Sequence, residues 1–197
     1  MGRSSFPRRQ QYRRLRQAAR SGAAAIAVGV LAIIAAGAHA PEVAFALVFA
    51  MIGLGLDSRR WLVLAGRSRV GARSEDEVQR TLARLEAEGW RLRHSLRWRG
   101  HGDIDSIAIT PTGLGFAIET KTRTHGDGHA ARVREQAAWL SLRRRRWCKR
   151  GALPVVCLAR RRGVEHVEAG VLVVSIDRLT SALRTAAGLR DRPGFMR

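Results

Sequence analysis

Two acids and a lysine stand near the ends of two apolar stretches in the middle of the chain. Asp105 lies at the start of the first stretch, and Glu119 and Lys121 lie at the end of the second. Hydrolysis of a phosphodiester requires a divalent cation that polarises the phosphate, an activated water, and compensation for charge on the leaving oxygen. Mg²⁺ prefers one or two carboxylates together with water and substrate oxygens. Asp105 and Glu119 are therefore candidate ligands for Mg²⁺ or Mn²⁺.

Lys121 is a candidate for orienting the attacking water or offsetting charge in the transition state. Lysine is rare in this chain and arginine provides nearly all other positive charge, so composition does not account for Lys121. The carbonyl of Thr120 is a candidate third ligand, and Glu75 would join the site if its helix packs against the strand ends. The alternative for Glu119 and Lys121 is an ion pair on an exposed strand. For Glu75 it is a charge that suits a helix N-terminus.

A β-hairpin over residues 102–121 is expected to position these side chains. Side chains alternate along a strand, so Glu119 and Lys121 should share one face of the second strand. Thr110-Pro111-Thr112-Gly113 predicts the turn, because proline presets φ and glycine accepts a positive φ. Asp103 shares a face with Asp105 and fits a strand cap better than a ligand.

Further elements follow from periodicity. Ser74 is expected to N-cap a helix that ends near Gly89, and residues 90–98 alternate as a half-exposed strand does. Residues 130–142 predict a helix, 153–158 and 171–176 predict strands, and 177–187 predict a closing helix. This order favours a small α/β (α+β) fold with a mixed central sheet flanked by helices.

The charge of the chain points to a polyanionic partner. The formal net charge is +20, which favours binding to nucleic acid or to an anionic membrane surface. A dense basic run follows the helix at 130–142 and is a candidate for phosphate contacts. It consists of Arg143, Arg144, Arg145, Arg146, Lys149 and Arg150. Two cysteines, Cys148 and Cys157, form neither a disulfide framework nor a zinc site, which favours a reducing compartment.

The first 56 residues have a different composition. A basic arm at 1–20 precedes two uncharged apolar runs, 21–38 and 43–56, separated by a short connection. A signal peptide would leave the second run unexplained, and Pro41 and Glu42 would interrupt a single long span. A transmembrane helical hairpin over 21–56 accounts for both runs, although each is short for the ~20 residues that a span needs. Arginines outside both ends would then place the soluble part in the cytoplasm, at the cell membrane.

The motifs, taken in order, resemble the nuclease-related (NERD) domain of the PD-(D/E)xK nuclease superfamily. They are Gly71-x-x-x-Glu75, Gly102-x-Ile104-Asp105, Pro111-Thr112-Gly113, Ile118-Glu119-Thr120-Lys121 and Gln136. The resemblance covers about residues 70 to 180 and implies a restriction-endonuclease-like core. It also implies Asp105 and Glu119 as metal ligands, Lys121 as the catalytic lysine, Glu75 as a supporting acid and Gln136 as a residue that helps position the site.

The sequence thus predicts five parts. They are a basic arm (1–20), a transmembrane hairpin (21–56), a basic linker (57–70), a nuclease-like domain (71–188) and a basic tail (189–197). The expected function is a membrane-anchored, Mg²⁺- or Mn²⁺-dependent nuclease that hydrolyses phosphodiester bonds of DNA, with RNA as the less favoured substrate. The alternative is a catalytically inactive, membrane-anchored module that binds nucleic acid or a protein partner.

Overall fold

A computed structural model describes residues 6–98, 102–124 and 126–191. The chain divides into two compact units, one formed by residues 7–70 and one that comprises residues 71–197. The arm and tail expected at the two ends lie partly outside the described residues. Each unit is considered separately below.

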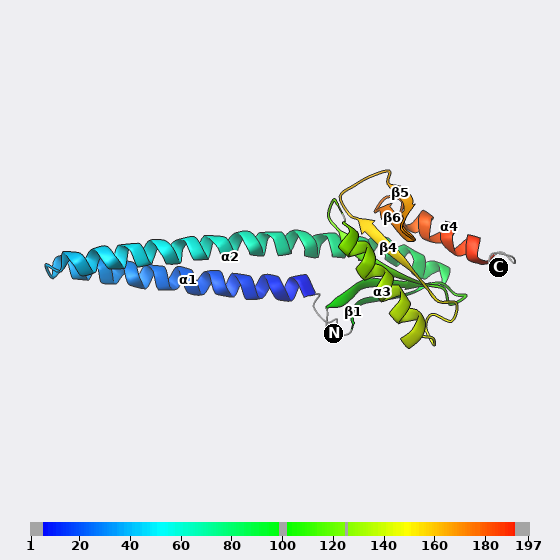
Figure 1. The fold of residues 1–197 in the computed structure, drawn as a ribbon, viewed down its shortest axis with the longest axis horizontal. Helices are drawn as coiled ribbons and strands as arrows, with labels where there is room; N and C mark the ends of the chain where they lie inside the picture. The colour runs from blue at the N-terminus through cyan, green and yellow to red at the C-terminus, as the bar shows by residue number, and fades with distance from the viewer. Residues whose placement is uncertain (1–5, 99–101, 125, 192–197) are drawn as a thin grey trace. The chain divides into compact units, whose positions relative to one another are not determined.

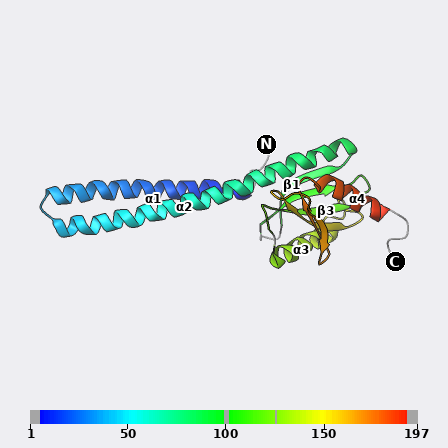
Figure 2. The ribbon, with the colours of Figure 1, turned by 90° about the horizontal axis from the view of Figure 1, so that it is seen from above.

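The first unit is a helical hairpin. α1 (Phe6–Gly37) and α2, which begins at Pro41, lie side by side and are joined by a turn in which His39 has a φ of 53° (Figures 1 and 2). Both are long and apolar enough to cross a membrane, judged by length and composition alone. Large apolar side chains point outward from both helices, including Ile33 and Phe45.

Polar contacts join the two helices beyond the apolar runs. The hydroxyl of Ser21 donates to Asp57 Oδ2 at 2.6 Å, and the indole N–H of Trp61 donates to the same oxygen at 3.1 Å. Arg14 Nη1 donates to the carbonyl of Leu64 at 2.8 Å and to Ser68 Oγ at 2.6 Å. These contacts fix the register of the two helices on the side of the hairpin that carries the arginines.

The helix that carries Glu75 begins much earlier than the sequence predicts. α2 runs without interruption over Pro41–Leu82, so the expectation that Ser74 caps its N-terminus is wrong. Residues 57–70, for which composition predicts a linker, are helical. A glycine inside a helix costs about 1 kcal/mol relative to alanine, which does not interrupt α2 at Gly66 or Gly71. No proline follows Pro41 within α2. A 3₁₀ helix (Ala83–Glu88) continues to Gly89, whose φ of 81° ends it where the sequence predicts.

The second unit contains a six-stranded sheet with the order β1-β2-β3-β4-β6-β5. β3 pairs parallel with β4 and β4 with β6, whereas the other pairs are antiparallel, which confirms the mixed sheet. The strands are β1 (Arg91–Arg97), β2 (Asp103–Ile109), β3 (Gly115–Lys121), β4 (Ala152–Leu158), β5 (Glu165–Glu168) and β6 (Val171–Ser175). The helices are α3 (Asp127–Arg143) and α4 (Leu179–Asp191). The sequence did not predict β5, because its four exposed residues show no apolar alternation.

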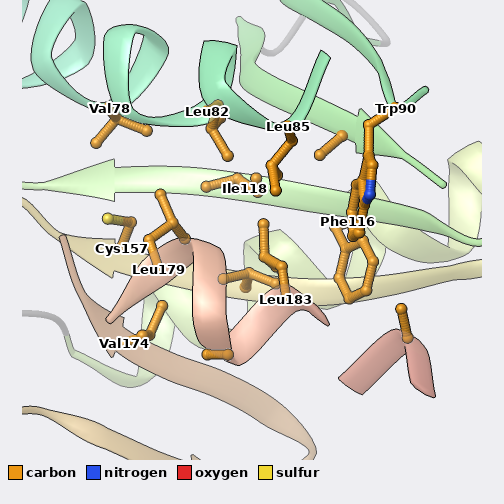
Figure 3. Packing of buried hydrophobic residues seen from close by; sticks show 14 of the residues in the cluster. Val78, Leu82, Leu85, Trp90, Phe116, Ile118, Cys157, Val174, Leu179 and Leu183 are labelled. Carbon is orange, nitrogen blue, oxygen red and sulfur yellow. The ribbon is translucent and has the colours of Figure 1, made fainter. Parts of the chain in front are cut away.

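Helices cover both faces of this sheet. The end of α2, the 3₁₀ helix and α4 pack on one face, where Phe116 and Ile118 of β3 are buried (Figure 3). α3 packs on the other face, where Ala117 is buried. Successive residues of β3 therefore enter different cores, as strand alternation requires. The fold confirms the α+β class, with the central strand β3 buried on both sides.

The turn between β2 and β3 is as predicted. The N–H of Gly113 donates to the carbonyl of Thr110 at 3.0 Å, and Gly113 has a φ of 87°. The hydroxyl of Thr110 accepts the N–H of Leu114 at 2.9 Å. Backbone and side chain of one threonine thus close the hairpin.

Candidate active site

Asp105 lies where the ladder between β2 and β3 ends. The last paired residues are Ser106 and Ile118, and continuing the register by one residue places Asp105 opposite Glu119. Instead of another ladder bond, the N–H of Thr120 donates to Asp105 Oδ2 at 2.8 Å. The carboxylate therefore occupies the gap between the two strands.

The neighbouring strand is also irregular at this level. β1 pairs His94 with Ser106 and Leu96 with Ile104, but Ser95 between them has a φ of 52° and pairs with no residue of β2. A positive φ is uncommon for any residue with a Cβ, and such strain often accompanies functional sites. The break in β1 lies beside Asp105.

Glu119 and Lys121 share a face of β3, as predicted. Lys121 Nζ donates to Glu119 Oε1 at 2.8 Å. Glu119 is 4% exposed, so it is not part of an ion pair on a solvated strand, whereas the Lys121 side chain remains 24% exposed. The second oxygen, Glu119 Oε2, is buried without a hydrogen-bond partner among the described residues.

The electrostatics bring Glu75 into the same group. Burial raises the pKa of Asp105 well above its usual value, and the negative charges of Glu119 and Glu75 raise it further. The hydrogen bond from Thr120 and the charge of Lys121 act in the opposite direction. By strand alternation Glu119 lies on the face covered by α3, while the α2 helix that carries Glu75 covers the other face. The negative charges of two acids from different elements, β3 and α2, thus act on Asp105.

Gln136 is buried on α3. It has no exposed surface, and neither its amide oxygen nor its amide nitrogen has a hydrogen-bond partner within the described part of the chain. Its neighbours in the helix, Val133, Ala137 and Leu140, belong to the core between α3 and the sheet. Burying an amide without a partner costs about 1–3 kcal/mol, so Gln136 carries a cost in stability at this position.

The basic run does not join the acids. Arg150 N donates to the carbonyl of Gly113 at 3.0 Å, and the N–H of Gly115 donates to the carbonyl of Gly151 at 2.9 Å. The run therefore lies at the start of β3, whereas Glu119 lies at its end. At about 3.3 Å per residue, the four residues from Gly115 to Glu119 correspond to roughly 13 Å along the strand.

Arg144 of the basic run is instead part of a cluster that the sequence did not predict. The guanidinium groups of Arg93 and Arg144 lie 4.6 and 4.9 Å from the ring centroid of Trp147, and Arg144 is also 5.5 Å from the ring of Trp139. Arg91 Nη2 donates to the carbonyl of Trp147 at 3.4 Å. The alternating arginines of β1 were the one sequence signal, but their partner lies more than fifty residues away.

The donor set fits a hydrated divalent cation. Within residues 6–98, 102–124 and 126–191, no three side chains of His, Cys, Asp or Glu are grouped as a protein-only metal cage requires. Mg²⁺ does not need such a cage, since it retains waters and binds one or two carboxylates. Asp105 and Glu119 provide two, and Glu119 Oε2 is buried and unpartnered.

One family of known proteins matches part of the chain. Residues 70–156 match the family described as nuclease-related domain (NERD). The match extends from Glu75 on α2 through β1, β2, β3 and α3 into β4, so it includes all five predicted site residues. No curated protein and no solved structure matches the chain. Residues 70–156 are thus similar to a nuclease-related domain, and the mixed sheet is consistent with the PD-(D/E)xK superfamily.

Proposed function

We propose that this protein is a membrane-anchored, divalent-metal-dependent nuclease that hydrolyses phosphodiester bonds of DNA at the end of β3. The observation that carries the proposal is the meeting of Asp105, Glu119 and Lys121, with one buried carboxylate oxygen unpartnered. A structural ion pair would satisfy both oxygens of a buried carboxylate. The nuclease-related domain supports the same class of activity.

Each side chain has a distinct task in this proposal. Asp105 and Glu119 hold Mg²⁺ or Mn²⁺, which when bound supplies charge to polarise the phosphate. Lys121, partly exposed, orients the attacking water and offsets charge that develops on the phosphate oxygens. Glu75 increases the negative potential at Asp105, which favours a cation there, and Gln136 is a positioning residue.

The hairpin is proposed to anchor this domain in the cell membrane. Two long apolar helices with outward-facing Ile, Val, Leu and Phe side chains support it. The arginines outside both apolar runs support an orientation with the nuclease-related domain on the cytoplasmic side. The substrates would then be polynucleotides that reach the inner membrane surface.

The test is cleavage by the full chain in detergent. Plasmid DNA and a long RNA are incubated with Mg²⁺, with Mn²⁺ and with a chelator, using wild type, Asp105→Asn and Lys121→Ala. Metal-dependent cleavage of DNA by wild type alone supports the proposal. Equal cleavage of RNA would correct its substrate. A wild-type protein that binds DNA but cuts with neither ion would establish the inactive binding module instead.

A further inference from the structure

A groove on the surface of α2 begins where the apolar run of this helix ends. The residues that line it recur at helical spacing, so one side of the helix carries them all. They are Leu56, Arg59, Arg60, Val63, Leu64 and Arg67. Arginines thus alternate with aliphatic side chains along the groove. Such a surface suits a ligand that has an anionic end and a hydrocarbon end.

No acid neutralises the arginines of the groove. Residues 1–73 contain two acids, Glu42 and Asp57. Glu42 lies in the first turn of α2, at the other end of the apolar run. Asp57 Oδ2 already accepts two hydrogen bonds within the hairpin. The arginines of the groove are exposed, and none of them is paired with a carboxylate among the described residues, so their charge is available to a ligand.

Contacts between α1 and α2 set the depth of the groove relative to the apolar runs. Ser21, the first residue of the run in α1, bonds to Asp57, which directly follows the run in α2. The uncharged part of the hairpin therefore ends at one level on both helices. Residues 21–37 extend over about 25 Å, against about 30 Å for the hydrocarbon core of a bilayer. In a membrane, Arg59 and Arg60 would thus lie at the level of the head groups.

The direction of α2 tilts the arginines of the groove towards the membrane. Helical side chains lean towards the N-terminus of their own helix, and in α2 that direction leads from the groove to the apolar run at 43–56. The two helices run in opposite directions (Figure 1). Arg13 and Arg16 of α1 therefore lean away from the apolar runs by the same rule. Only the arginines of α2 are oriented to reach lipid phosphates.

From these relationships we infer that the groove binds one anionic phospholipid, with its phosphate at the arginines and an acyl chain along Val63 and Leu56. The inference rests on the proposed anchoring of the hairpin in a membrane and is independent of the nuclease activity. The planar donors of arginine match a phosphate. A polynucleotide would use these donors and leave the aliphatic floor of the groove uncovered, so a lipid is the better match.

A fluorophore beside the groove would measure its occupancy. Gly66 precedes Arg67, and the position of a Cβ on it has open space around it. The native thiols of Cys148 and Cys157 are buried, so Gly66→Cys should accept a single environment-sensitive maleimide dye. The labelled full chain in neutral detergent is titrated with phosphatidylglycerol, phosphatidylcholine, glycerol phosphate and duplex DNA. Phosphatidylglycerol alone is expected to give a response that saturates at a low mole fraction of lipid in the micelle.

Variants assign this response to the groove. Arg60→Gln combined with Arg67→Gln should raise the half-saturating mole fraction about 30-fold, at roughly 1 kcal/mol per arginine. The charge-matched control is Arg13→Gln with Arg16→Gln, two exposed residues of α1 that do not line the groove; it should change the midpoint little. Arg60→Lys with Arg67→Lys retains the charge without the planar donors, so its midpoint should lie between those of wild type and the glutamine variant.

The outcomes distinguish this site from its alternatives. An equal response to phosphatidylcholine, a response that rises in proportion to phosphatidylglycerol without saturating, or an equal loss in the α1 control would overturn the lipid site. Saturation by glycerol phosphate or by DNA would overturn the choice of a lipid. Membrane fractionation of cells that express the full chain tests the anchor separately. A chain that fractionates with membranes yet gives no response to phosphatidylglycerol refutes this inference alone, and one that stays in the soluble fraction refutes the anchor.

Discussion

The ammonium of Lys121 lies 2.8 Å from Glu119 Oε1, while Oε2 of the same buried carboxylate has no partner in the described chain. The lysine thus neutralises the acid from one side and leaves the other oxygen available. A metal bound at Oε2 would lie within reach of the charge that Lys121 carries. In the proposed function, this second oxygen of Glu119 would be the one that holds the metal.

Substitution of Lys121 should separate cleavage from metal binding. Lys121→Ala should reduce the cleavage rate by about 10²–10⁴-fold, the range typical for loss of a positioned catalytic group. Metal-induced stabilisation should persist, because both carboxylates remain. Plasmid cleavage and melting temperature with and without Mn²⁺ measure the two effects. Arg84→Ala on the other face serves as the control, and retained cleavage in Lys121→Ala would remove the lysine from the mechanism.

The raised pKa of Asp105 predicts an unusual pH dependence of stability. The folded state binds the proton of the Asp105 carboxyl group more tightly than the unfolded state does. The stability that this protonated carboxyl group contributes is therefore fully present below the pKa of Asp105 in the unfolded chain. It is lost as pH rises towards the folded pKa. Asp105→Asn should therefore raise the melting temperature at pH 7–8 and leave it nearly unchanged near pH 4 (about the unfolded value). The amide oxygen of the substituted side chain can still accept a hydrogen bond from the N–H of Thr120, so this contact is retained in Asp105→Asn.

A divalent cation should offset the destabilising effect of the charged Asp105 carboxylate at neutral pH, and only in the wild-type protein. Mn²⁺ at neutral pH should stabilise the wild-type protein, since it binds the charged carboxylates of the folded state. Asp105→Asn should gain much less. Equal stabilisation of both proteins by Mn²⁺ would show that Asp105 is not a ligand.

Gln136→Leu should affect stability and activity in opposite directions. The amide is fully buried with both polar atoms unpartnered, so an apolar side chain of similar size should stabilise the fold by about 1–3 kcal/mol. Cleavage should fall, because in the proposed function the amide of Gln136 helps to position the residues of the site. Urea unfolding and plasmid cleavage test the two parts. A destabilised variant would show that an internal water satisfies the amide.

The hairpin predicts where single cysteines can be labelled. His39→Cys, in the turn between α1 and α2, should react with a membrane-impermeant maleimide in intact cells that express the full chain. Val167→Cys, 72% exposed on β5, should react only after lysis. The native thiols of Cys148 and Cys157 are buried, and burial raises the pKa of Cys157 to about 12, so they should remain unreactive. Labelling of both variants in intact cells would contradict the proposed orientation.

Local rules predicted most of the sheet and its hairpin. Alternation predicted β1, apolar stretches predicted β2, β3, β4 and β6, and the Thr-Pro-Thr-Gly sequence predicted the turn between β2 and β3. β5 was not predicted because it lies at an exposed edge and buries nothing. The start of the helix at Ser74 was wrong because a good capping residue does not end a helix that is already propagating.

The sequence named candidate site residues but did not predict how they lie relative to one another. That Asp105 accepts the N–H of Thr120 in the gap between two strands depends on where the ladder ends, which strand alternation does not determine. The separation of the basic run from the acids depends on the direction of α3 across the sheet. Sequence proximity placed them together, whereas the parallel pairing of β3 with β4 places them apart.

The seven-residue length of β3 has a consequence for how this domain can vary. Insertion of one residue would turn Glu119 and Lys121 to the opposite face of the sheet, because side chains alternate. Only changes of two residues preserve the site. The distance along β3 between the turn at Gly113 and the pair formed by Glu119 and Lys121 can therefore change only in increments of about 6.6 Å.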